Sequence, residues 1–195
     1  MVVSKKEMTR IRQDGKMVPV TLVEILPQKV LRYKTTDKDG YQAVVIGVNE
    51  TETKKEKGQK LAYDTVVEFK VDENFQTSHE AGSDLDLSFL EGIETVSVKG
   101  VSKGKGYQGV MKRFHLQGGP KTHGSKFHRH VGSMGNRKPR RTMKNHPHAG
   151  HMGDELITLK KISILDRLNK ENEQLLVVKG SLPGARNSQL KFIIE

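Results

Sequence analysis

Cysteine and tryptophan are both absent from the 195 residues, and hydrophobic residues make up only 34% of the chain. Without cysteine, disulfides and thiolate metal ligands are excluded. No apolar run approaches the roughly 18 residues of a membrane-spanning helix. Residues 1–6 contain no apolar stretch of signal-peptide length. We therefore expect a soluble, intracellular protein with no membrane partner.

Acidic residues are missing from residues 99–153, which we name the basic segment. It contains 13 of the 34 Lys and Arg residues, 11 of the 19 Gly and seven of the eight His. The other 140 residues hold 21 basic and 23 acidic side chains, so the net charge of +11 arises in this segment. Its few large apolar residues cannot close a core, and its like charges repel one another. We expect it to be extended or disordered unless a polyanion holds it; a solvated basic linker is the alternative.

Helical periodicity is lacking in the two flanking parts, residues 1–98 and 154–195. Apolar and alternating runs are separated there by turn signals such as Asp14-Gly15 and Asp39-Gly40. Seven or eight short strands fit a small antiparallel barrel or sandwich. The predicted fold class is all-β: a small antiparallel β-barrel body (1–98 and 154–195) with a long, mostly irregular basic loop (99–153) inserted between strands. The expected strands are 17–25, 30–35, 41–48, 65–71, 93–98, 156–165, 173–179 and 190–194, with a loop at 49–60 and a turn at 168–172.

A glycine motif in the basic segment matches a nucleotide-binding fingerprint by sequence alone. Residues 104–109 read Gly-Lys-Gly-Tyr-Gln-Gly, which fits G-x-G-x-x-G. The fingerprint requires an acidic residue about 20 positions later, and none occurs before Asp154. The P-loop spacing also fails. We therefore expect no nucleotide cofactor here, and interpret the glycines as positions where backbone approaches a surface closely and neighbouring lysines meet phosphates.

Two groups of histidines suggest a metal site, but their surroundings argue against one. The groups are 123, 128 and 130, and 146, 148 and 151. No carboxylate lies within the segment to offset a cation or to orient an imidazole. Serines near these histidines likewise lack an acid for a catalytic triad. We expect no metal, no cofactor and no catalysis; a histidine- or metal-dependent nuclease is the alternative.

Nucleic-acid recognition accounts best for the basic segment. Cations occur in close groups, with Tyr, Phe and His interleaved among them. Cations bind phosphates, and planar rings stack on unpaired bases, which suits a folded RNA. A free nucleic-acid chaperone that binds duplexes indiscriminately is a further alternative. The candidate RNA-binding residues are Lys103, Lys105, Tyr107, Lys112, Arg113, His123, Lys126, His128, Arg129, Arg137, Lys138, Arg140, Arg141 and Lys144.

Residues 102–113, Ser-Lys-Gly-Lys-Gly-Tyr-Gln-Gly-Val-Met-Lys-Arg, resemble a family signature. The signature is Ser/Thr-x-Gly-basic-Gly-x-x-Gly-x-x-x-Arg of the large-subunit ribosomal protein "L three" family, bacterial or organellar type. Further matches follow in order at 122–124, 128–135 and 149–155. Residues 5–11 resemble its opening strand and residues 176–185 its closing segment.

This resemblance implies a barrel of the translation-protein type and a loop that threads through rRNA. It implies a primary rRNA-binding protein that binds near the 3′ end of large-subunit rRNA and nucleates subunit assembly. Neighbours would be other large-subunit proteins, L fourteen and L nineteen, and the protein would not be a homo-oligomer. The loop tip would approach the peptidyl transferase centre, with residues Ser133, Met134, Gly135, Asn136, Arg137 and Lys138.

The tip departs from the family in one respect. Bacterial members often carry a methylated Gln there, whereas this chain has no Gln between Gln117 and Gln174. We predict that the modification is absent, which a mass spectrum of the tip peptide would check.

Overall fold

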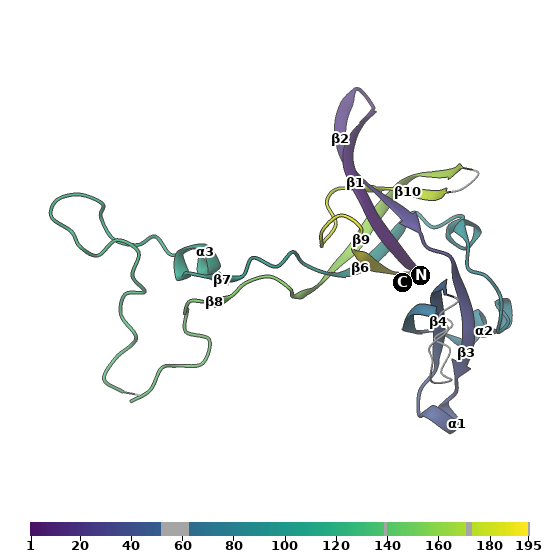
Figure 1. The fold of residues 1–195 in the computed structure, drawn as a ribbon, viewed down its shortest axis with the longest axis horizontal. Helices are drawn as coiled ribbons and strands as arrows, with labels where there is room; N and C mark the ends of the chain where they lie inside the picture. The colour runs from purple at the N-terminus through teal and green to yellow at the C-terminus, as the bar shows by residue number, and fades with distance from the viewer. Residues whose placement is uncertain (52–62, 139, 171–172, 195) are drawn as a thin grey trace. The chain divides into compact units, whose positions relative to one another are not determined.

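The structure is a computed structural model that describes residues 1–51, 63–138, 140–170 and 173–194 (Figure 1). The chain divides into two compact units. The first comprises Met1–Gly100 and Ile157–Glu195, and the second, Val101–Leu156, contains most of the basic segment. Among the described residues, no helix has the length and apolar character needed to cross a membrane.

Six strands of the chain close into a barrel in the order β1, β11, β6, β9, β10, β2. The β1–β2 turn is formed by Asp14 and Gly15, whose φ angles of 49° and 76° are those that a two-residue hairpin turn requires. Strands β6 and β9 are neighbours in the barrel, so the second unit is an insertion between adjacent strands. The strands are β1 (Val2–Gln13), β2 (Lys16–Ile25), β6 (Thr95–Val101), β9 (Leu156–Lys170), β10 (Glu173–Lys179) and β11 (Gln189–Ile193).

A separate antiparallel sheet contains β3 (Gln28–Lys34), β4 (Ala43–Glu50) and β5 (Tyr63–Lys70). The central strand β4 is apolar from Ala43 to Val48, and Val44, Ile46 and Val48 are buried. Helix α1 (Thr36–Asp39) connects β3 to β4, whereas α2 (Glu73–Ser78) and the 3-10 helix η1 (Leu87–Leu90) lie between β5 and β6.

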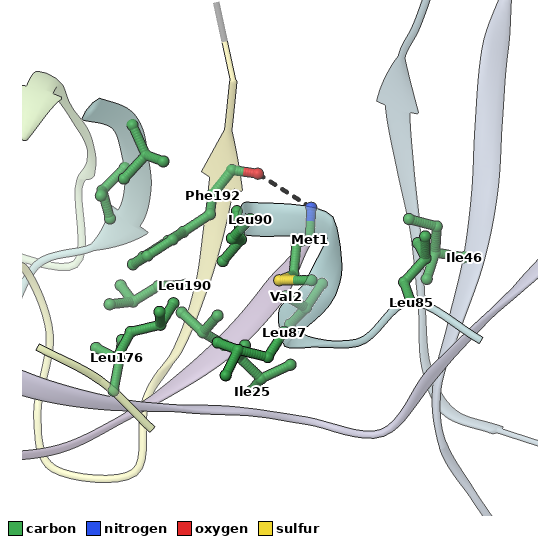
Figure 2. Close-up of a cluster of buried hydrophobic side chains, with 14 of the residues drawn as sticks. Met1, Val2, Ile25, Ile46, Leu85, Leu87, Leu90, Leu176, Leu190 and Phe192 are labelled. Atoms are coloured by element: carbon green, nitrogen blue, oxygen red, sulfur yellow. Dashed lines mark hydrogen bonds between the residues drawn. The ribbon is translucent and has the colours of Figure 1, made fainter. Parts of the chain in front are cut away.

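The sheet and the barrel share one hydrophobic core. Figure 2 shows side chains from β1, β2, β10 and β11 gathered near Leu87 and Leu90 of η1, with Ile46 of β4 beside Leu85. Leu90, Leu176 and Phe192 are at most 1% exposed. Full burial of each such side chain stabilises the fold by about 1.5–3 kcal/mol. The second sheet is therefore packed onto the barrel by the segment that contains η1.

Gln28 is a buried polar residue that joins the start of the barrel to β3. Its Oε1 accepts a hydrogen bond from Val2 N at 2.9 Å, and its Nε2 donates to Val2 O at 3.2 Å and Leu26 O at 3.1 Å. The side chain thus satisfies buried backbone groups of Val2, which lies one residue before the first β1–β2 pair, Val3 with Ile25. In the same region, the Met1 amino group donates to Phe192 O at 3.0 Å (Figure 2).

The predicted fold class is confirmed: the chain is nearly all-β, with a closed six-stranded barrel. The expectation that the flanking parts lack helices was wrong at α1, α2 and η1, because helices of four to six residues are too short to show a 3.6-residue period. The strand count was too low: eleven strands occur among the described residues, and three of them form the separate sheet.

The expected loop at residues 49–60 and the expected turn at residues 168–172 also differ from the structure where it describes them. Asn49 and Glu50 belong to β4, and residues 52–60 of the expected loop lie outside the described residues. Residues 168–170 of the expected turn are strand, because β9 continues to Lys170; positions 171–172 are likewise outside the described residues.

Candidate nucleic-acid interface

The two arms of the second unit pair with each other to form a stem. Strand β7 (Tyr107–Gln108) is antiparallel to β8 (Gly150–His151), side by side in Figure 1. Backbone hydrogen bonds extend this pairing: Ser102 N to Glu155 O at 2.9 Å, Lys105 N to Met152 O at 2.8 Å, and Met152 N to Gly106 O at 3.0 Å. The stem orders residues 102–108 and 150–155 without an apolar core.

Glycines allow the two arms to approach this closely. A Cβ added at Gly104 would lie 2.5 Å from Oδ2 of Asp154, and one added at Gly153 would clash with the carbonyl oxygen of Lys103. Gly153 also has a φ of +83°, which favours glycine. The glycine motif at 104–109 therefore contributes to the unit's own pairing. It leads into a two-residue strand and a five-residue helix, and not into the long helix of a dinucleotide-binding unit.

Helix α3 (Val110–Phe114) follows β7 and is tied to the opposite arm by Arg113. Val110 is buried, and Nη1 of Arg113 donates to His148 O at 2.9 Å. A Cβ at Gly150 would lie 2.6 Å from that nitrogen, so glycine leaves the space for the guanidinium. The guanidinium also lies 5.0 Å from the Phe114 ring centre. Arg113, predicted as an RNA-binding residue, is half-buried and holds the two arms together, a role that the sequence pattern did not reveal.

A second closure joins residues 118–120 to residues 127–128. Gly119 N donates to His128 O at 3.0 Å, and the His128 ring nitrogen Nδ1 lies 3.1 Å from Pro120 O. A Cβ at Gly119 would clash with the Phe127 carbonyl oxygen. Phe127 remains 48% exposed, 5.1 Å from the His130 ring, and thus offers a planar surface to a partner. The role of Gly119 in this closure was also missed, because the sequence Gly118-Gly119-Pro120 is typical of a turn and does not indicate a contact with residues 127–128.

The remaining candidate residues are exposed. Apart from the half-buried Arg113, this holds for every predicted RNA-binding and tip residue, and Tyr107 is 76% exposed. At the tip, Ser133 Oγ bonds only locally, accepting from Gly135 N at 3.3 Å. Among the described residues, no ion pair involves a Lys or Arg of the basic segment. The exposed cations among the candidates are Lys103, Lys105, Lys112, Lys126, Arg129, Arg137, Lys138, Arg140, Arg141 and Lys144, and Lys121 is exposed as well.

In contrast to the cations of the basic segment, several cations of the first unit form ion pairs with carboxylates. Lys6 lies 2.8 Å from Glu24, Lys29 lies 3.1 Å from Glu50, and Lys34 lies 2.6 Å from Glu68. The hydrogen bond between Lys34 and Glu68 lowers the pKa of Glu68 and raises the pKa of Lys34. Uncompensated positive charge is thus concentrated in the second unit.

The histidine groups do not converge on one point. His151 Nε2 lies 3.4 Å from Asp154 Oδ2, His146 and His148 have ring centres 5.1 Å apart, and His128 contacts Pro120. Within the described ranges, no set of three or more His, Asp or Glu side chains is placed to hold a metal ion. The geometry is that of a cationic, glycine-shaped surface with exposed rings.

Comparison with known proteins agrees with this geometry. The family model for ribosomal protein L3 matches residues 51–174. The chain is 40% identical to the large ribosomal subunit protein uL3 of Oceanobacillus iheyensis over 193 residues, which cover 95% of this chain and 91% of the relative. It is 38% identical to that of Persephonella marina (98% and 88% covered) and 36% identical to that of Borreliella burgdorferi (96% and 94% covered). The chain therefore belongs to the ribosomal protein L3 family, whose members are structural proteins of the large ribosomal subunit rather than enzymes.

Proposed function

We propose that this chain is a structural constituent of the cytoplasmic large ribosomal subunit and binds rRNA directly through the basic segment, residues 99–153. Residues 1–98 and 154–195 form the body that supports it. The observation that carries the proposal is the set of exposed cations with no carboxylate partner among the described residues. Such charges bind phosphates with release of counterions, which favours association with a polyanion.

The exposed rings add contacts that charge alone does not provide. Tyr107, Phe127 and His130 lie among the cations and are exposed. Aromatic and imidazole rings stack on unpaired bases, which occur in folded RNA and not within a regular duplex. Backbone hydrogen bonds and glycines order the stem, so these rings and cations are presented on a partly ordered scaffold.

The finer part of the proposal rests on the family resemblance. Binding is near the 3′ end of large-subunit rRNA and nucleates subunit assembly. The tip, residues 133–138, extends toward the peptidyl transferase centre. The protein acts as one copy, beside the ribosomal proteins L fourteen and L nineteen.

RNA crosslinking with mass spectrometry on large subunits from the source cells tests the proposal. We expect crosslinks from Lys103, Lys126 and Lys144 into rRNA near the peptidyl transferase centre. A protein that stays in the soluble fraction without rRNA crosslinks would contradict the proposal. Equal affinity for unrelated duplex DNA and for the 3′ region of the rRNA would favour a non-specific chaperone.

A further inference from the structure

The hairpin of β1 and β2 has a portion that no other strand supports. Strand β11 pairs with β1 only at residues 2–4, with further backbone bonds at Lys5. Strand β10 pairs with β2 only from Val20 onward, and Gly180 N donates to Pro19 O. In the part of the chain that the structure describes, residues 6–18 therefore have no strand neighbour other than β1 and β2 themselves. We name them the free hairpin; Figure 1 shows its tip standing out from the barrel.

The strand register divides the free hairpin into two different faces. Residues directly opposite each other share a face, as do alternate residues along a strand. Arg12 is opposite Met17, Arg10 is opposite Pro19, and Met8 is opposite Thr21. One face of the free hairpin therefore contains Met8, Arg10, Arg12 and Met17, and Pro19 continues that face. The other face contains Ile11 opposite Val18, both half-buried, and Gln13 opposite Lys16.

The face with the two arginines is exposed and carries positive charge only. Met8 is 50% and Met17 58% exposed, and both arginines are exposed. The hairpin's acidic residues lie elsewhere: Glu7 is on the opposite face and Asp14 is in the turn. None of the ion pairs among the described residues involves Arg10 or Arg12. The guanidinium groups of Arg10 and Arg12 thus lie on one strand between exposed apolar side chains.

We infer that this face of the free hairpin is a second RNA-binding surface, separate from the basic segment, that binds the backbone of a helical rRNA segment. The inference rests on the proposed function, because it assumes that the protein meets rRNA. The planar guanidinium group is suited to bidentate phosphate recognition. The minor groove of an RNA helix is wide and shallow, so a thin two-stranded ribbon can lie across it with both arginines at phosphates and the methionines against sugars. An isolated two-stranded hairpin is marginally stable alone, and such contact stabilises it.

Binding of the full chain to an rRNA fragment, measured against salt and by hydroxyl-radical footprinting, tests the inference. R10Q/R12Q removes two phosphate contacts and should make the slope of log affinity against log salt shallower by about 1.4–1.8. At 0.1 M salt this corresponds to a loss of affinity of roughly 25- to 60-fold. One patch of rRNA protection should disappear while the remaining protection persists. R10K/R12K, which keeps the charge, should retain most of the slope. The matched control K38Q/K70Q removes two exposed cations from elsewhere in the same unit and should change neither readout.

The outcomes separate the two proposals. If the wild-type chain does not bind rRNA, the proposed function itself fails. If the wild-type chain binds and R10Q/R12Q has the same slope and footprint, with unchanged thermal unfolding, only the hairpin inference is overturned. Crosslinks in assembled subunits from residues 8–17 to an acidic protein, and none to rRNA, would also overturn it.

Discussion

The cations in the tip of the basic segment and in the residues just after it allow a quantitative test of how the chain holds RNA. Five of them lie between residues 137 and 144, all exposed and outside every ion pair among the described residues. We consider a variant in which all five become Gln, which removes charge but keeps side-chain length and polarity. The substituted residues are Arg137, Lys138, Arg140, Arg141 and Lys144.

The expected effect follows from counterion release. Each phosphate contact contributes about 0.7–0.9 to the slope of log affinity against log salt. With 8 to 13 contacts, the wild-type slope should be about −6 to −12, and loss of five contacts should make it shallower by about 3.5–4.5. At 0.1 M salt, one slope unit corresponds to one decade of affinity, so binding should weaken by roughly 3.5 to 4.5 orders of magnitude. Fluorescence anisotropy with an rRNA fragment between 0.05 and 0.3 M salt, about a sixfold range, measures this directly.

A charge-matched control separates contact from net charge. Replacement of Lys29, Arg32, Lys34, Lys38 and Lys70 by Gln removes five cations from the three-stranded sheet and α1. There, Lys29 and Lys34 already pair with Glu50 and Glu68 at 3.1 and 2.6 Å. The control should leave the slope within about one unit of wild type. An unchanged slope in the tip variant, or an equal change in the control, would refute the assignment of phosphate contacts to the tip.

The remaining predictions concern residues whose geometry fixes their role. Gly119→Ala should weaken rRNA binding by about tenfold, because a Cβ clashes with the Phe127 carbonyl and breaks a backbone hydrogen bond; Gly109→Ala, with nothing within 4 Å and a φ of −70°, should have little effect in the same assay. Gln28→Ala should lower the free energy of unfolding in urea by about 2–4 kcal/mol, since it removes three hydrogen bonds and leaves buried backbone groups of Val2 unpaired; a loss below about 0.5 kcal/mol would contradict that role. Leu176→Ala, at a side chain with 0% exposure, should cost about 2–5 kcal/mol by the same measurement.

Features that depend on local pattern could be predicted from the sequence. The apolar run at β4 and the turn at Asp14-Gly15 are contained within a few consecutive residues, so the strands and the all-β class followed from them. The basic segment was recognisable because the absence of acids is a property of composition and needs no contact. Helix η1 was missed because two buried leucines in four residues show no period.

Non-local contacts could not be predicted in this way. Lys105 and Met152 are far apart in the sequence, and neither carries a signal that their backbones pair. Arg113 was grouped with the RNA-binding cations because a guanidinium looks the same in sequence whether it meets a phosphate or the His148 carbonyl. The exposed arginine face of the free hairpin likewise follows only from the strand register.

Because β6 and β9 are adjacent in the barrel, the length of the connection between them can be related to the stability of the fold. The connection between them runs from Val101 to Leu156, where an ordinary hairpin would need about four residues. Because the entropy of loop closure rises only logarithmically, by about 0.6 kcal/mol for each doubling, a connection more than ten times longer costs only about 2–2.5 kcal/mol more. The backbone bonds of the stem close the loop near its base and offset part of that cost. The stability of the barrel therefore depends only weakly on the length of the basic segment. Insertions or deletions near the tip can change how far the segment reaches while the barrel remains unchanged.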